Sequence, residues 1–288
     1  MAAVTIDEAL QIALHHHNAG RFAAAEAIYR QVLAEQPDHA DAWELLGVLA
    51  GQRGDFEEAV ACVRRAIAVM PDRANYHVNL GELQRRRGRL DEAIAAARRA
   101  IELRPAWAIG HANLGIALWQ KGELEAAAEA AGQAMLLEPT LAEARHTLAL
   151  VRSDQKRYGE AVALYREALQ LRPDFHQAYN SLGVALRELG RLDEAIGACS
   201  TAIQLQPEYA EAHSNISVAL REAGRLDEAV AAARTALGLD PKMANAHSNL
   251  SSALADSGRL AEAVAAARAA LRLDPKNAGA HNNLGFAL

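Results

Sequence analysis

Apolar and small residues recur along the chain at the spacing of one helical face. Residues three, four or seven apart share one side of an α-helix, so each such set predicts one helix with a buried stripe. The two sets in residues 176–209 are Leu182, Gly183 and Leu186, and then Ala195 and Ala202. Because a glycine, Gly190, lies between the sets, the pattern predicts two helices of about 14 residues each, joined by a tight turn.

Proline marks the period of this pattern. Each of the eight prolines lies 34 residues after the one before: Pro37, Pro71, Pro105, Pro139, Pro173, Pro207, Pro241 and Pro275. A fixed period of this length is the signature of a helical repeat protein. With proline at place 32 of the unit, the predicted repeats are 6–39, 40–73, 74–107, 108–141, 142–175, 176–209, 210–243 and 244–277. A lead-in, 1–5, precedes them, and 278–288 is predicted to be the first helix of a truncated ninth repeat.

Place 15 of the unit is predicted to end the first helix. It is glycine in seven of the eight repeats, with Lys156 as the exception. Glycine readily takes the left-handed conformation that closes a helix. Acidic pairs such as Asp91-Glu92 follow this place, where they favour the positive end of a second helix. Proline then ends that helix, because it lacks an N–H group and clashes with the preceding turn.

The pattern resembles the tetratricopeptide repeat family. The matching residues in one repeat are Tyr179, Leu182, Gly183, Gly190, Ala195, Ala202 and Pro207, and in another Trp43, Leu46, Gly47, Gly54, Ala59, Ala66 and Pro71. The resemblance covers residues 6–288. It implies an all-α fold, a right-handed α-solenoid in which first helices line a concave groove and second helices form the outside.

Composition narrows the function classes. The net charge of −6 argues against a nucleic-acid binder, which needs a basic surface, and against attachment to an anionic membrane. No run of 18 apolar residues and no signal peptide occur, and the two cysteines, Cys62 and Cys199, are predicted to be free core residues. We therefore expect a cytoplasmic protein whose partner is a protein or an extended peptide.

Places 2, 6, 9 and 13 form the predicted exposed stripe of each first helix, since places 7, 8 and 11 are buried. Asparagine recurs at place 6, at Asn79, Asn113, Asn215, Asn249 and Asn283. Stacked repeats would align these amides in a ladder along the groove, and an amide carries both a donor and an acceptor for the backbone of a bound peptide. The alternative is that asparagine is a tolerated polar residue on a solvated face.

The motifs around the ladder, His-Ala-Asn-Leu-Gly at 111–115 and His-Asn-Asn-Leu-Gly at 281–285, resemble the superhelix of the protein O-GlcNAc transferases. In that family a groove ladder of asparagines holds the acceptor polypeptide. The match carries over to the five asparagines alone, and Leu45, Thr147 and Ser181 interrupt it.

Other residues invite functional interpretations of their own. Arg85 and Arg86 lie at the groove edge, where they are candidate contacts for an acidic partner segment or simply a solvated turn. Trp119 is a candidate anchor for a partner peptide. The histidines at place 4 lie about a repeat apart, without the HxxxH spacing of a metal site, so they are predicted to pack, and no metal or other cofactor is expected.

No catalytic motif occurs in the chain: it has no glycine-rich phosphate loop, GxSxG, HExxH or CxxC. Three hypotheses follow. The first is a non-catalytic scaffold that binds a protein or extended peptide. The second is the substrate-recognition region of an O-GlcNAc-transferase-like glycosyltransferase whose catalytic domain lies beyond residue 288. The third is self-association through the uncapped C-terminal end.

Overall fold

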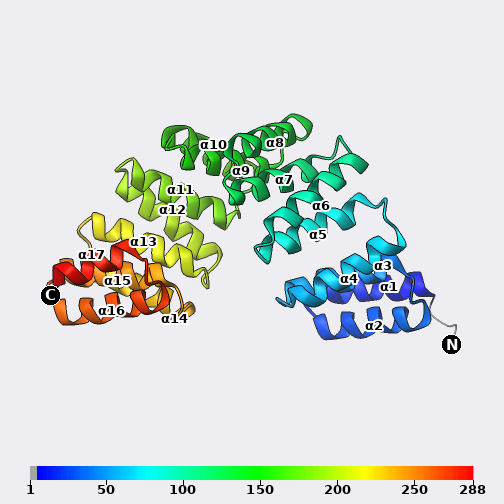
Figure 1. The fold of residues 1–288 in the computed structure, drawn as a ribbon, viewed down its shortest axis with the longest axis horizontal. Coiled ribbons are helices and arrows are strands. Elements are labelled where there is room, and N and C mark those ends of the chain that lie inside the picture. Colours follow the sequence, from blue (N-terminus) through cyan, green and yellow to red (C-terminus); the bar gives the residue numbers. More distant parts are fainter. Residues whose placement is uncertain (1–4, 288) are drawn as a thin grey trace. The chain divides into compact units, whose positions relative to one another are not determined.

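The computed structural model describes residues 5–287, in which the regular structure is entirely helical (Figure 1). The helices are α1 (Ile6–Asn18), α2 (Phe22–Glu35), α3 (Ala40–Gln52), α4 (Phe56–Val69), α5 (Ala74–Arg86), α6 (Leu90–Leu103), α7 (Ala108–Lys121), α8 (Leu124–Leu137), α9 (Ala142–Asp154), α10 (Tyr158–Leu171), α11 (His176–Glu188), α12 (Leu192–Leu205), α13 (Ala210–Glu222), α14 (Leu226–Leu239), α15 (Ala244–Asp256), α16 (Leu260–Leu273) and α17 (Ala278–Ala287). The predicted lead-in, 1–5, lies outside the described residues except for Thr5. The Thr5 side chain caps α1 by accepting the Glu8 N–H.

The odd-numbered helices are the first helices of the hairpins, and each begins 34 residues after the last. The turn within each hairpin passes through the left-handed region. Gly122 has φ 86°, and its N–H donates to carbonyls at the end of α7. Lys156 holds the same conformation, with φ 59°, although its Cβ disfavours it. The turn geometry therefore follows from the place in the repeat, and glycine only makes it easier.

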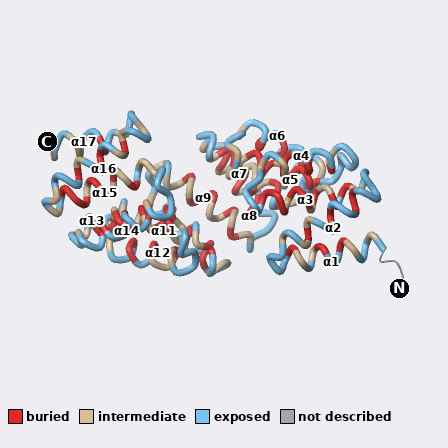
Figure 2. Tube along the Cα trace, turned by 90° about the horizontal axis from the view of Figure 1, so that it is seen from below, coloured by how far each residue is buried: buried red, intermediate tan, exposed pale blue. Residues whose placement is uncertain are grey.

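Small residues set the close approach of the two helices in a hairpin. A Cβ on Gly183 of α11 would lie 2.4 Å from the Cys199 sulfur and 3.1 Å from the Ala195 carbonyl oxygen of α12. Ala195 and Ala202 of α12 are fully buried. Because interiors are packed nearly without voids, only glycine or another very small residue fits this crossing. Figure 2 shows the resulting alternation of buried and exposed residues along the helices.

The chain divides into two compact units, residues 1–147 and residues 148–288, which we call the N-terminal and the C-terminal unit. Within each unit, successive first helices pack on one another, as α5 does on α7 and α13 on α15. No comparable packing joins successive second helices among the described residues. The first helices of a unit therefore gather on one side of the stack. The predicted all-α solenoid of helical hairpins is confirmed.

Among the described residues, no helix is both long enough and apolar enough to cross a membrane.

Candidate functional site

The side of each unit where first helices gather carries an accessible stripe, which we call the first-helix face. It consists of places 2, 6, 9 and 13 of each first helix. On α13, Glu211 and Glu222 are exposed, and Asn215 and Val218 between them are half-buried. The neighbouring Ser214 is buried. The face is therefore a shallow surface whose floor is formed by places 6 and 9.

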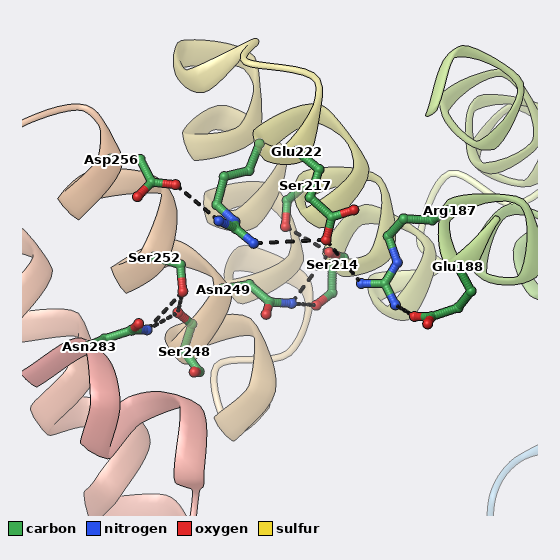
Figure 3. A network of polar contacts seen from close by, with 11 residues as sticks. Arg187, Glu188, Ser214, Ser217, Glu222, Ser248, Asn249, Ser252, Asp256 and Asn283 are labelled. Carbon is green, nitrogen blue, oxygen red and sulfur yellow. Dashed lines mark hydrogen bonds and ion pairs between the residues drawn. The ribbon is translucent and has the colours of Figure 1, made fainter. Parts of the chain in front are cut away.

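In the C-terminal unit the floor is joined across repeats by side-chain amides (Figure 3). Asn215 Nδ2 donates to Asn180 Oδ1 of the preceding first helix over 3.0 Å. Asn249 Nδ2 donates to Ser214 Oγ over 3.0 Å and lies 3.5 Å from the Ser214 carbonyl oxygen. Both links run from an asparagine at place 6 to place 5 of the repeat before it.

Asn283 completes this row. Its Nδ2 donates to the Ser248 carbonyl oxygen over 3.1 Å and to Ser252 Oγ over 2.8 Å. We call the whole set the amide seam; it consists of Asn180, Ser214, Asn215, Ser248, Asn249, Ser252 and Asn283. It was not predicted from the sequence, although polar residues at place 5, which should be buried, were a signal for it.

The seam fixes which end of two of its amides is accessible. The carbonyl oxygens of Ser214 and Ser248 can only accept, so the contacting atom of Asn249 and of Asn283 must be nitrogen. The Oδ1 atoms of these two asparagines accept no hydrogen bond from a described residue and are not buried unsatisfied atoms. They therefore meet solvent. The sequence predicted both a donor and an acceptor for a ligand, whereas at Asn249 and Asn283 the nitrogen is engaged within the protein and the oxygen is accessible.

Among the described residues of the N-terminal unit there is one such link, and its acceptor is a carboxylate. Asn79 Nδ2 of α5 donates to Glu44 Oε1 of α3. The Glu44 residue is only 9% exposed. Its pKa is raised to about 7, chiefly because burial disfavours the charged form and secondly because Asp41 is a like charge, while the Asn79 hydrogen bond acts in the opposite direction.

The remaining ladder residues of this region differ from one another. Asn113 is half-buried on α7, and its side chain makes no hydrogen bond with any residue that the structure describes. Of the residues predicted to interrupt the ladder, Leu45 is half-buried on α3. Thr147 Oγ1 donates to the Glu143 carbonyl oxygen of its own helix.

Charged side chains border the amide seam at places 12 and 13 (Figure 3). Arg187 pairs with Glu188, and lies 3.7 Å from Glu222 of the next first helix. Arg221 in turn lies 3.0 Å from Asp256. Exposed pairs of this kind contribute only about 0.2–1 kcal/mol each. The positive and negative charges along this border of the seam therefore compensate one another.

At the corresponding places of the N-terminal unit, the two predicted arginines share one carboxylate. Arg85 donates to both carboxylate oxygens of Glu82 over 2.8 Å, and Arg86 Nε reaches the same side chain over 3.1 Å. Two cations on one anion leave a local excess of positive charge. Trp119 is half-buried on α7 at the place that Arg85 occupies on α5.

The place-4 side chains have a structural role. His77 Nε2 donates to the Pro71 carbonyl oxygen over 2.8 Å, and Trp43 Nε1 to that of Pro37 over 2.7 Å. The same bond to the proline six residues earlier is made by His111, Arg145, His213, His247 and His281. Each of these histidines carries its proton on Nε2, because a carbonyl only accepts. No group of three candidate metal ligands comes together among the described residues.

Comparison with known proteins agrees with this architecture. A family model described as tetratricopeptide repeat matches residues 10–50, 48–108, 146–210 and 214–278, which is more than half of the chain. The chain belongs to the tetratricopeptide repeat family. A second tetratricopeptide repeat model matches residues 108–133. No curated protein matches the chain.

Two solved tetratricopeptide-type structures are similar. One is the crystal structure of the APC/C hetero-tetramer Cut9–Hcn1, with a TM-score of 0.80 and 19% identity, covering 98% of this chain and 56% of that one. The chain thus spans little more than half the length of that relative, and the likeness concerns the fold. The other is YrrB, described as a TPR protein with an unusual peptide-binding site, with a TM-score of 0.50 and 25% identity, covering 65% of this chain and 96% of that one.

Proposed function

We propose that this tetratricopeptide repeat chain is a non-catalytic scaffold whose first-helix faces hold an extended segment of a partner protein. The observation that carries the proposal is the orientation of the amide seam. The seam turns the Oδ1 atoms of Asn249 and Asn283 toward solvent at the same place of successive repeats. Such a row of acceptors suits the main-chain N–H groups of an extended peptide, whatever its side chains. The likeness to YrrB, a peptide-binding repeat protein, supports it.

The five ladder asparagines have unequal roles in this proposal. Asn215, Asn249 and Asn283 follow one another in the C-terminal unit and supply the main row of acceptors. Asn79 and Asn113 lie in the N-terminal unit, where the Asn113 side chain makes no hydrogen bond with a described residue. We therefore assign main-chain recognition chiefly to the C-terminal unit.

Side-chain recognition is assigned to the N-terminal unit. The excess charge of Arg85 and Arg86 over Glu82 suits an acidic side chain of the partner. Trp119 is proposed to contact an apolar side chain of the same segment, since aromatic side chains bury much area at little entropic cost. The exposed Ile109 on α7, at place 2 of the first-helix face, extends this apolar surface.

The experiment is peptide capture by fluorescence anisotropy, with a peptide selected from a random display library on the intact chain as the probe. The triple variant Asn215→Ala, Asn249→Ala, Asn283→Ala should bind it on the order of 100-fold more weakly, because three hydrogen bonds of about 1 kcal/mol each are lost. Gln170→Ala with Gln204→Ala, which removes exposed amides from second helices, is the matched control.

A modified ligand separates recognition from stability, since the triple variant also breaks the seam. Replacing single peptide N–H groups by ester oxygens removes donors and leaves the protein unchanged. Undiminished binding of every ester analogue, together with undiminished binding by the triple variant, would remove the ladder from the proposal.

The other two hypotheses remain predictions. A recognition region of an O-GlcNAc-transferase-like enzyme rests on the ladder motifs, and neither the family models nor the two structures add to it. Self-association stays a hypothesis for the helix α17, which carries the exposed Phe286. Sedimentation velocity over a range of concentrations, with Phe286→Ser as the variant, tests it.

A cytoplasmic location is proposed because Cys62 and Cys199 are buried free thiols, as a reducing compartment would leave them.

A further inference from the structure

One buried carboxylate in the N-terminal unit joins two repeats. Glu44 lies at place 5 of α3, and its Oε1 accepts the hydrogen bond of Asn79 from α5. Asp41, one turn earlier on α3, accepts the Tyr76 hydroxyl of the same helix α5. Two acids of one helix are thus bound by two donors of the next, and they lie side by side in the contact between repeats.

No cation compensates Glu44. Among the described residues, no lysine, arginine or histidine forms an ion pair with it. The groups that face it are the Asp41 carboxylate on its own helix, the phenol of Tyr29 on α2, and Tyr76 and Asn79 on α5.

The basic side chains beside this cluster interact with its tyrosines. His17 of α1 contacts the Tyr29 hydroxyl and Gln52. The positive charge of Arg73 lowers the pKa of Tyr76, against the larger opposite effect of burial. An ionised Glu44 therefore has a like charge beside it and a single hydrogen bond in its support, which is an unfavourable state for a buried carboxylate.

The same place in the C-terminal unit shows that a carboxylate is not needed for the link. There Asn180, Ser214 and Ser248 accept the amide of the following repeat, and all three are neutral. The geometry of the seam is thus conserved between the units within this chain, and only the N-terminal unit combines it with a group that can gain or lose a proton.

We propose that Glu44 makes the contact between α3 and α5 proton-linked, so that this contact is closed when Glu44 is protonated and opens more often when Glu44 is ionised. The protonated acid keeps the carbonyl that accepts from Asn79 and loses its repulsion from Asp41. The ionised form gains water only if α3 and α5 separate. The proposal concerns the contact itself and does not depend on whether the face binds a peptide.

The pH dependence of closure follows from its linkage to proton binding by Glu44. The closed state holds the Glu44 proton more tightly than the open state, in which the carboxyl has its ordinary pKa of 4.5. Closure is therefore strongest at acidic pH and weakens as pH rises through neutrality. The seam of the C-terminal unit, held by neutral groups, should not follow this course.

The test is hydrogen–deuterium exchange of the intact chain between pH 5 and pH 8, corrected for the intrinsic exchange rate. Amides of α3 and α5 should lose protection on the order of 10- to 100-fold over this range. Amides of α13 and α15 serve as the internal reference. Glu44→Gln, which keeps the acceptor for Asn79, should abolish the loss, and Glu92→Gln, which alters an exposed acid on α6, should leave it unchanged.

A second measurement needs no variant. The side-chain carboxyl carbon of Glu44, observed by NMR in the wild-type chain, should titrate near neutral pH and in parallel with the loss of protection. The proposal is overturned if Glu44 titrates near its ordinary pKa, or if the pH dependence of α3 and α5 persists in Glu44→Gln, which would assign it to another group.

Discussion

The two units of the chain make the same contact between successive first helices with different chemistry. In the C-terminal unit Asn215 and Asn249 donate to a neutral amide and a neutral serine. In the N-terminal unit Asn79 donates to the buried carboxylate of Glu44. The donor and its place are unchanged, and the acceptor alone decides whether the contact carries a charge. The difference shows that geometry within a repeat array can be retained while its response to pH changes from one repeat to another.

The largest effect is expected from giving the C-terminal unit the chemistry of the N-terminal one. Asn180→Asp places a carboxylate in a site where Asn180 is 8% exposed. At pH 8 the C-terminal unit should lose about 3–4 kcal/mol of stability, because the new charge is buried. The loss should shrink toward pH 4, where the acid is neutral. Urea unfolding followed by hydrogen exchange of α11 and α13 measures it, and an equal loss at both pH values would contradict the explanation.

The converse change is expected to stabilise the N-terminal unit. Glu44→Gln should raise its free energy of unfolding at pH 8 by up to about 3 kcal/mol, since a folded pKa of about 7 against an ordinary 4.5 disfavours the ionised acid in the folded state. The sign is that of an acid with a raised pKa: the wild-type stability is fully present below pH 4.5 and is lost as pH rises through 7. The gain should therefore vanish near pH 4. A gain that is constant with pH would point to packing instead of charge.

Smaller effects distinguish a seam asparagine from an unpaired one. Asn249→Ala should cost about 1–2 kcal/mol, because it leaves the Ser214 hydroxyl oxygen without its donor. Asn113→Ala should change stability by less than about 0.5 kcal/mol, since its side chain forms no hydrogen bond with the described residues. Thermal unfolding by circular dichroism compares the two. Equal costs would mean that the seam adds nothing to stability.

The smallest change concerns the turns within hairpins. Lys156→Gly should stabilise the C-terminal unit by about 1 kcal/mol, because a non-glycine residue there holds φ 59°. Gly122→Lys, at the equivalent turn with φ 86°, is the matched reverse change and should cost a similar amount. If both variants lower the melting temperature, the lysine makes a contact that outweighs its backbone conformation.

The solenoid of hairpins could be predicted because its determinants are local. Pro207 ends a helix and Gly190 allows a turn through their own backbone chemistry, and both recur at a fixed interval. The exposed stripe followed from helical periodicity in the same way. The partners of its side chains did not follow, because Asn249 donates to a residue 35 positions earlier. Only the spacing between stacked helices brings these two together.

The raised pKa of Glu44 could not be predicted from the sequence, for the same reason. A glutamate in mid-helix is ordinarily solvated, and its burial depends on α2 and α5 covering it. The place-4 histidines were predicted to pack, and their Nε2 bonds to proline carbonyls add a definite partner to that prediction. The sequence thus predicts the scaffold well, and it predicts interactions between repeats only where the chemistry of one residue decides them.

The bonds from place 4 to the proline carbonyls have a consequence for redesign of the array. Each spans a loop of fixed length, from Pro71 to His77 or from Pro37 to Trp43. Adding a residue within that span would move the ring away from its acceptor, so foreign sequence should be grafted elsewhere. Histidine, tryptophan and arginine all make the bond. The place-4 residue can therefore be exchanged for another long side chain with a terminal N–H group, and the bond to the proline carbonyl is kept.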